Sequence, residues 1–146
     1  MIRNIIFAED DEDDQFYFRE VFQEINKNIQ LQFVSNGNEL MQMLQNFLPD
    51  MVFLDLEMPY KNGLECLVEL RNNPSLNKLP VIVLSSTVRP VNIQTAYEMG
   101  ASLFLHKSST DSDYAESLKK IMSMDWNDPE EIRGKYFGNN QFRSFN

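Results

Sequence analysis

Five short apolar runs, separated by segments with helical periodicity, constrain the fold of this chain more than any other feature. Such short and uniformly apolar runs are typical of strands buried on both faces of a parallel sheet. Strands that alternate with helices favour an α/β fold in which helices cover both faces of the sheet. The chain therefore predicts a doubly wound, five-stranded parallel sheet, with strands at Asn4–Ala8, Leu31–Val34, Met51–Asp55, Val81–Ser85 and Ser102–His106.

Helix start and stop signals lie between these runs. Asn36 followed by Glu39 is typical of a capping box at a helix start. Pro90 suits the first turn of a helix, and Gly100 suits a left-handed cap at a helix end. The predicted helices are marked, in chain order, by Phe16 to Ile25, Asn36 to Phe47, Gly63 to Asn72, Pro90 to Gly100, and Asp111 to Met122.

Size and charge narrow the class of protein. A chain of 146 residues with 42% hydrophobic content is sufficient for one domain with a core. The net charge of −9 disfavours a nucleic-acid or membrane partner. The N-terminal apolar stretch ends at Ala8, which is too short for a signal peptide, and no later segment approaches the length of a membrane span. We expect a cytoplasmic protein whose single cysteine, Cys66, serves core packing.

Six consecutive acids, residues 9–14, follow the first predicted strand. Glu9 and Asp10 would lie at its carboxyl end, where open α/β sheets bind ligands. Two carboxylates ~4 Å apart repel by about 4 kcal/mol at an effective dielectric of about 20, which favours a divalent ion or a raised pKa. Oxygen ligands that leave room for water suit Mg²⁺. Asp10 with Asp11 is the alternative pair, although Ala8 as the last apolar residue favours Glu9 with Asp10; Asp13 or Asp14 would then cap the first helix.

Other polar residues end the neighbouring strands. In a sheet with the order 2-1-3-4-5, strands one and three are adjacent, so Asp55 would face Glu9 and Asp10. Ser85 ends the fourth strand and Lys107 follows the fifth, on the same edge of the sheet. Such a site could accept a phosphoryl group, because Mg²⁺ and Lys107 would neutralise its oxygens while Ser85 donates a hydrogen bond.

With these residues the chain resembles the receiver domains of response regulators in two-component signalling, which have a flavodoxin-like (βα)5 fold. The resemblance runs from about Ile2 to Met124. It rests on the acid pair after the first strand, Asp55 within the stretch 53–59, Gly63, Ser85 and Lys107. It implies a receiver domain over residues 1–124, followed by a tail over residues 125–146 that forms no separate output domain.

The resemblance implies a role for each site residue. Asp55 would be the phosphoacceptor, taking a phosphoryl group from a phosphohistidine of a sensor histidine kinase or a phosphotransfer protein. Asp10 and Asp55 would bind Mg²⁺ directly, helped by the backbone carbonyl of Glu57, while Glu9 would act through a metal-bound water. Lys107 would pair with Asp55 or with its phosphate.

The resemblance also implies a switch. Ser85 would move toward the phosphate, and Phe104 would move inward behind it, so that a local charge change biases a bistable element. Glu57 and Thr87 would flank the phosphate and set the lifetime of the phosphorylated state. The face formed by the fourth helix, the fifth strand and the fifth helix would then contact a downstream protein.

Three positions depart from the family pattern. Ser108 follows Lys107 where the family commonly has proline, which leaves the cis or trans geometry of that bond open, since a serine adopts cis only at a cost of ~3 kcal/mol. Phe104 replaces the commoner tyrosine, and Glu9 replaces the commoner aspartate. His106 is the only histidine and ends an apolar strand, so we predict a packing role for it and not a phosphohistidine.

The segment from about Met124 has a different character. Asp128 to Glu131 is typical of a helix start, and we expect Gly134 and the later Gly138, Asn139 and Asn140 to break any longer element. The segment is rich in aromatic residues, which predicts packing against the domain or contact with a partner or a second copy. These residues are Trp126, Tyr136, Phe137, Phe142 and Phe145.

Two other functions stay open at this stage. One is a Mg²⁺-dependent phosphoryl-transfer or nucleic-acid enzyme, which the small size and acidic surface disfavour. The other is an interaction module that works without phosphorylation, which the set of Asp55, Ser85 and Lys107 disfavours. We therefore predict a single-domain response regulator, not an enzyme, which binds a target or passes the phosphoryl group onward.

Overall fold

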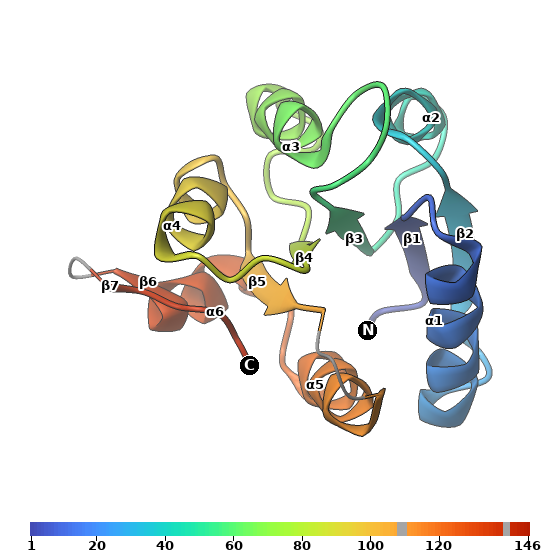
Figure 1. Cartoon of the computed structure of the whole chain (residues 1–146). Coiled ribbons are helices and arrows are strands. Elements are labelled where there is room, and N and C mark those ends of the chain that lie inside the picture. The colour runs from blue at the N-terminus through green and yellow to red at the C-terminus, as the bar shows by residue number, and fades with distance from the viewer. Residues whose placement is uncertain (108–110, 139–140) are drawn as a thin grey trace.

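The centre of the molecule is a parallel sheet with the strand order β2-β1-β3-β4-β5 (Figure 1). This computed structural model describes residues 1–107, 111–138 and 141–146. The predicted order and strand direction are confirmed, and two bounds differ by one residue: β2 starts earlier, and β5 starts after Ser102. The strands are β1 (Asn4–Ala8), β2 (Gln30–Val34), β3 (Met51–Asp55), β4 (Val81–Ser85) and β5 (Leu103–His106).

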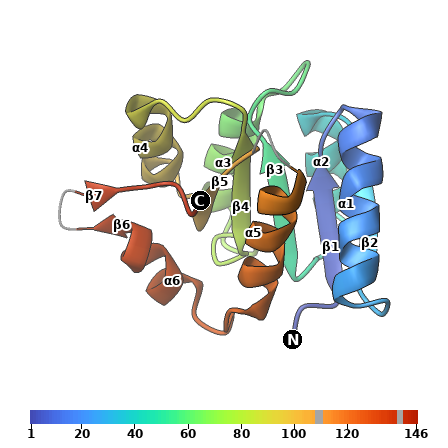
Figure 2. The ribbon, with the colours of Figure 1, turned by 60° about the horizontal axis from the view of Figure 1, so that its bottom comes forward.

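Helices cover both faces of this sheet. Figure 2 shows α1 and α5 together on one side, while α2, α3 and α4 lie on the other side. The C-terminal helix α6 and a small hairpin of β6 and β7 lie beside α4 and β5. The bounds are α1 (Glu12–Ile25), α2 (Gly37–Leu44), α3 (Gly63–Asn72), α4 (Pro90–Glu98), α5 (Asp111–Ser123), α6 (Pro129–Tyr136), β6 (Phe137–Gly138) and β7 (Gln141–Phe142).

Strand side chains alternate between two cores, because successive residues of a strand point to opposite faces. Phe7 and Phe53 contact the α1 and α5 layer, where their rings stack at 4.6 Å between centroids. Ile6 and Leu54 contact the α2, α3 and α4 layer. Cys66 is fully buried in this second core, as its predicted packing role requires, and burial raises the pKa of its thiol to about 11.

The first helix is capped by a residue other than the two predicted. Asp11 Oδ1 accepts from the backbone N–H of Asp13 at 2.8 Å and of Asp14 at 3.1 Å, so the prediction of Asp13 or Asp14 as the cap was wrong. The physical reason is that α1 begins at Glu12, and the N-cap is the residue just before a helix. Asp14 is thereby left free of capping and turns toward the site.

The second helix follows the predicted capping box. Asn36 Oδ1 accepts from the N–H of Glu39 at 2.9 Å. Glu39 returns a bond with its own carboxylate, which accepts from the N–H of Ser35 at 2.8 Å. These bonds satisfy donors that a helix start leaves without intrahelical partners.

The C-terminal segment packs on the domain. Trp126 is buried, and its Nε1 donates to the carbonyl of Ile121 at 2.8 Å. Gly134 lies inside α6, so the prediction that it breaks the helix was wrong. The helix persists because Asp128 caps its start and Arg133 donates to the carbonyl of Ala101 at 3.0 Å. Among the described residues, no helix has the length and apolarity that crossing a membrane requires.

Candidate functional site

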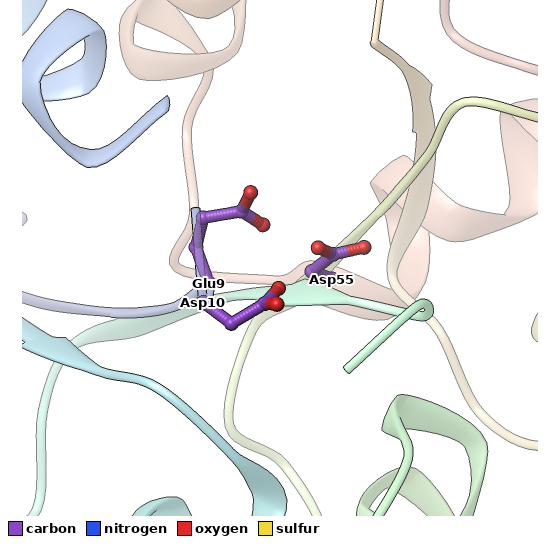
Figure 3. A group of neighbouring side chains, drawn as sticks. All are labelled: Glu9, Asp10 and Asp55. Atoms are coloured by element: carbon purple, nitrogen blue, oxygen red, sulfur yellow. The ribbon is translucent and has the colours of Figure 1, made fainter. Parts of the chain in front are cut away.

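Three carboxylates meet at the carboxyl ends of β1 and β3. Glu9, Asp10 and Asp55 each offer an oxygen, and these atoms all lie within 4.8 Å of one another (Figure 3). β1 and β3 are paired with Ala8 opposite Leu54, so the next residue on each strand is an acid at the same edge. Glu9 and Asp55 are buried, whereas Asp10 is exposed. This donor set fits a hard divalent cation that retains water ligands, and Asp11 has no part in it because it caps α1.

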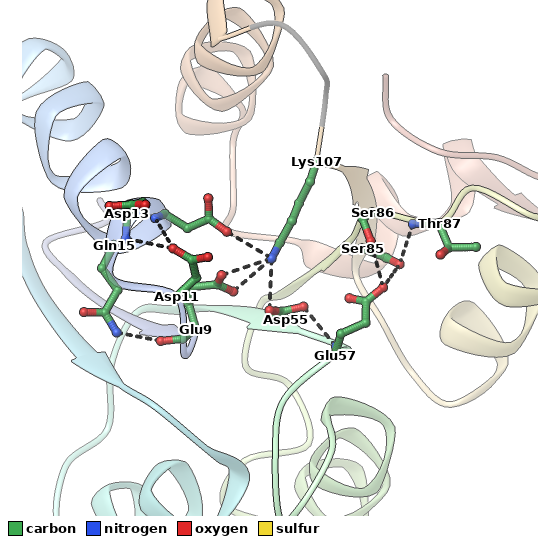
Figure 4. A network of polar contacts seen from close by, with 11 residues as sticks. Glu9, Asp11, Asp13, Gln15, Asp55, Glu57, Ser85, Ser86, Thr87 and Lys107 are labelled. Carbon is green, nitrogen blue, oxygen red and sulfur yellow. Dashed lines mark hydrogen bonds and ion pairs between the residues drawn. The ribbon is translucent and has the colours of Figure 1, made fainter.

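Lys107, which follows β5, reaches Glu9 and Asp55 of this group (Figure 4). Its Nζ donates to both carboxylate oxygens of Glu9, at 3.1 and 3.0 Å, and to Asp55 Oδ2 at 3.0 Å. Asp14 Oδ2 lies 3.4 Å from the same nitrogen. Burial alone would lower the pKa of the Lys107 ammonium, but Asp55 and Glu9 outweigh it and hold that pKa above its usual value. Three carboxylates thus share one ammonium.

The two buried carboxylates differ in how tightly they hold a proton. Burial, followed by hydrogen bonds with Asp55 and Asp14 and by the charge of Asp55, raises the pKa of Glu9 to about 10. Burial would also raise the pKa of Asp55, but hydrogen bonds with Glu9 and Glu57 and the charge of Lys107 hold it below its usual value. Asp55 is therefore the member of this pair that ionises more readily.

A separate set of hydrogen bonds lies on the opposite side of Asp55 (Figure 4). The N–H of Glu57 donates to Asp55 Oδ1 at 2.9 Å. The buried hydroxyl of Ser85 donates to the carboxylate of Glu57 at 2.7 Å and accepts from the N–H of Thr87 at 3.0 Å. Ser86 adds a longer contact of 3.4 Å to the same carboxylate. Burial and the neighbouring Asp55 raise the pKa of Glu57.

The remaining residues singled out in the sequence lie on β5 or directly after it. Phe104 is fully buried in the core with Tyr97 and Ile93, so its ring is already inside the domain in this structure. His106 is half-buried, and its backbone N–H and C=O are bonded by the Asn146 side chain; the packing role of its side chain stays a prediction. The Lys107–Ser108 bond lies outside the described residues.

Sequence reasoning missed three residues at the site. Asp14 contacts Lys107, and the Gln15 side chain donates to the carbonyl of Glu9 at 2.6 Å. Both lie in the first turns of α1, so a correct N-cap assignment would have brought them to attention. Tyr114 on α5 has a buried hydroxyl with no hydrogen-bond partner among the described residues. It lines a cavity of about 400 Å³ beside Lys107 and Asp14, and no sequence pattern signals it.

The sequence is similar to a known protein family and to individual regulatory proteins. Residues 5–119 match the family model of the response regulator receiver domain. Response regulator Rcp1 of Synechocystis is 29% identical over 126 residues, which cover 82% of this chain and 86% of that protein. The regulatory protein YvfU of Bacillus subtilis is 32% identical over 87 residues, but these span only 42% of YvfU.

Solved structures have the same architecture. The Mn²⁺-bound form of Rcp1 aligns with a TM-score of 0.78 at 28% identity, over 84% of this chain and 93% of that one. The phosphorylated cyanobacterial phytochrome response regulator RcpA aligns with a TM-score of 0.77 at 27% identity, over 83% and 91% of the two chains. With the family model covering most of its length, this chain belongs to the response regulator receiver domains of two-component signalling.

Proposed function

We propose that the protein is a single-domain response regulator that accepts a phosphoryl group on Asp55 in a Mg²⁺-dependent reaction. The observation that carries this proposal is the setting of the Asp55 carboxylate. One oxygen accepts from Lys107 Nζ and the other from the N–H of Glu57, and Glu9 and Asp10 complete a divalent-cation site beside it. The Mn²⁺-bound Rcp1 and the phosphorylated RcpA support both parts of the proposal.

The donor would be a phosphohistidine of a sensor histidine kinase or of a phosphotransfer protein. An Asp55 oxygen forms the new bond to phosphorus while the bond from phosphorus to the imidazole nitrogen breaks, and the imidazole leaves with the bonding electron pair. Mg²⁺, held by Asp10, Asp55 and the carbonyl of Glu57, with Glu9 acting through water, would supply positive charge to the transferring oxygens. Lys107, which donates to Asp55 Oδ2, would supply further positive charge.

The hydroxyl of Ser85 would then change partner. It donates to Glu57 in this structure, and it would leave that carboxylate to donate to a phosphoryl oxygen. Glu57 and Thr87 flank the same space, and we propose that they set the lifetime of the phosphorylated state. Because Phe104 is already buried, its response would be a repacking within the core behind Ser85.

We further propose that the output is protein contact and not catalysis. Residues 1–124 would form the receiver, and residues 125–146 would form an attached segment without a separate output function. The α4, β5 and α5 face would bind a downstream protein or a second copy of the chain. Its α4 and β5 part is contacted by α6 and the C-terminal residues, so any such partner would meet those residues as well.

Intact mass measurement tests the phosphoacceptor. Incubation with a small phosphodonor and Mg²⁺ should add about 80 Da, the mass of one phosphoryl group, and chelation of the metal should prevent the addition. Asp55→Asn should abolish the adduct, whereas Asp125→Asn, an exposed acid remote from the site, should leave it intact. An adduct that persists in Asp55→Asn would contradict the proposal, and no adduct in the unsubstituted protein would favour a module that works without phosphorylation.

A further inference from the structure

The outer edge of β5 is occupied by the C-terminal residues. β5 lies at one end of the sheet, and an edge strand presents unpaired N–H and C=O groups that can bind another chain. The carbonyl of Phe104 accepts from the N–H of Phe145 at 2.8 Å and from Ser144 Oγ at 3.3 Å. These contacts place residues 144–146 where a sixth strand would pair.

Asn146 extends this pairing with its side chain. Its Oδ1 accepts from the N–H of His106 at 2.9 Å, and its Nδ2 donates to the carbonyl of His106 at 3.0 Å. A carboxamide that accepts and donates in this way replaces the peptide group of a neighbouring strand. Both outward-facing groups of His106 are therefore satisfied by one side chain.

Tyr97 links the last free group of this edge to the same segment. Its hydroxyl accepts from the N–H of Phe104 at 3.1 Å and donates to the carbonyl of Arg143 at 2.9 Å. The ring of Tyr97 is fully buried, so the hydroxyl is fixed in place. All four backbone groups of Phe104 and His106 that face outward are thus bonded to residues 143–146, directly or through Tyr97.

Residues 143–146, which occupy this edge, are not deeply buried. Arg143 and Asn146 are exposed, and Ser144 and Phe145 are only half-buried. Most of its contacts with β5 are hydrogen bonds to the backbone, which any extended polypeptide can reproduce. A segment of this kind can therefore be exchanged for another without a change in the core.

We propose that the outer edge of β5 is a strand-binding surface, that residues 143–146 are its resident ligand, and that a partner protein binds by replacing them with an extended segment of its own. The partner segment needs a free N–H to reach the carbonyl of Phe104 and a carboxamide or peptide group to reach His106. The aromatic ring of Phe145 packs against Tyr136, with 5.6 Å between centroids, so an aromatic residue beside the free N–H completes the recognition.

The same edge is joined to the phosphoacceptor site. His106 is paired with Ser85 across β4 and β5, and the N–H of Lys107 donates to the carbonyl of Ser85 at 2.8 Å. Partner binding and phosphorylation would therefore influence one another reciprocally. This link rests on the proposed function, whereas strand binding at β5 does not.

The test uses a labelled peptide with the sequence of residues 141–146 and the full-length protein without Mg²⁺. In the double variant Phe145→Pro, Asn146→Ala, proline lacks the N–H and alanine lacks the carboxamide, so the edge is vacated. The peptide should bind this variant at least about tenfold more tightly than the unsubstituted protein, in which the resident segment competes. A peptide carrying proline at the position of Phe145 should bind neither protein.

Hydrogen exchange at the His106 amide shows whether the edge is vacated. Exchange should accelerate in the double variant and slow again when the peptide is added, and Asn127→Ala should leave it unchanged. An unchanged His106 amide in the double variant would overturn the role of residues 143–146 as ligand. An accelerated amide without peptide binding would overturn the strand-binding surface. Asp55→Asn protein should give the same binding, so a failure of phosphorylation is distinguishable from a failure here.

Discussion

The two sides of Asp55 differ in how their polar groups are paired. On the acid side, formed by Lys107 with Glu9 and Asp14 and by the neighbouring Asp10, carboxylates outnumber the single ammonium. On the hydroxyl side, formed by Glu57, Ser85 and Thr87, neutral donors and a carboxylate satisfy one another. Asp55 belongs to both, with Oδ2 on the acid side and Oδ1 on the hydroxyl side.

This difference separates the two events that we propose for the site. Burial and the crowding of the acids around one ammonium raise the pKa of Glu9, and a bound cation would favour its ionised form, so the acid side is prepared for metal binding. On the hydroxyl side the Ser85 hydroxyl and the Thr87 N–H already have acceptors, so their hydrogen bonds should change only when a stronger acceptor is present. A phosphoryl oxygen is such an acceptor. Substitutions on the two sides should therefore respond differently to Mg²⁺.

The largest effect is expected for Lys107→Met. The substitution removes the ammonium that Glu9 and Asp55 share, and loss of one partner of a buried pair costs about 3–5 kcal/mol of unfolding free energy. Chemical denaturation without metal measures this cost, and Mg²⁺ should recover part of it by replacing the lost charge. Lys119→Met is the control, because its pair with Glu24 is exposed at 3.7 Å and should be worth less than ~1 kcal/mol.

A loss below about 1 kcal/mol in Lys107→Met would contradict the acid side as described. It would mean that Glu9 and Asp55 tolerate each other without an ammonium. Mg²⁺ would then stabilise the variant and the unsubstituted protein equally, and substitutions on the acid side and on the hydroxyl side would no longer differ in their response to Mg²⁺.

The second effect concerns Glu9 and pH. Since the folded-state pKa of Glu9 is raised to about 10, its contribution to stability is fully present below its unfolded pKa of about 4.5 and is lost as pH rises toward the folded value. Glu9→Gln should therefore be more stable than the unsubstituted protein by about 2 kcal/mol at pH 8 without metal, with a smaller difference at pH 6. Denaturation at both pH values measures this.

Mg²⁺ should reverse that ranking. Metal binding favours the ionised form of Glu9, so the affinity of the unsubstituted protein should rise between pH 6 and pH 8 with release of a proton. Glu9→Gln should bind Mg²⁺ more weakly and with a flatter pH dependence. Glu12→Gln, in the same acidic run but exposed, should behave like the unsubstituted protein. Identical pH profiles for Glu9→Gln and the unsubstituted protein would refute the raised pKa of Glu9.

Whether a contact could be predicted from the sequence depends on which groups form it. The strand order and the meeting of Asp10, Asp55 and Lys107 were predictable, because apolar runs place the strands and parallel strands bring their ends to one edge. The cap of α1 was not, since several acids in residues 9–14 are chemically equivalent and only the helix start selects Asp11. The Ser85 to Glu57 bond depends on side-chain rotamers that no spacing specifies.

The C-terminal residues illustrate a second limit. Their aromatic content indicated packing, but their contacts with β5 are mostly bonds to backbone groups, which every residue carries alike. Four residues are also too few for a periodic pattern to emerge. Only the structure pairs Phe145 with Phe104 and Asn146 with His106.

The third effect lies on the hydroxyl side. Ser85→Ala removes the partner of Glu57 and of the Thr87 N–H at a buried position, so we expect a loss of about 1–2 kcal/mol in unfolding free energy. Ser86→Ala is the matched control, because its contact is long and exposed, and it should cost less than ~0.5 kcal/mol. Mg²⁺ should raise the melting temperature of Ser85→Ala as much as that of the unsubstituted protein. A weaker response to Mg²⁺ in Ser85→Ala would show that the two sides are not separate.

The smallest effect is expected for Tyr114→Phe. The Tyr114 hydroxyl is buried beside the acid side without a hydrogen-bond partner among the described residues, so its removal should leave stability unchanged or raise it by about 1 kcal/mol. Tyr97→Phe is the contrast, because that hydroxyl makes two bonds and its loss should cost about 1–2 kcal/mol. Thermal denaturation without metal compares the two. If Tyr114→Phe destabilised the protein as much as Tyr97→Phe, the Tyr114 hydroxyl would have a hydrogen-bond partner, such as a water bound between it and the acids. The carboxylates of the acid side would then have a further hydrogen-bond donor besides Lys107.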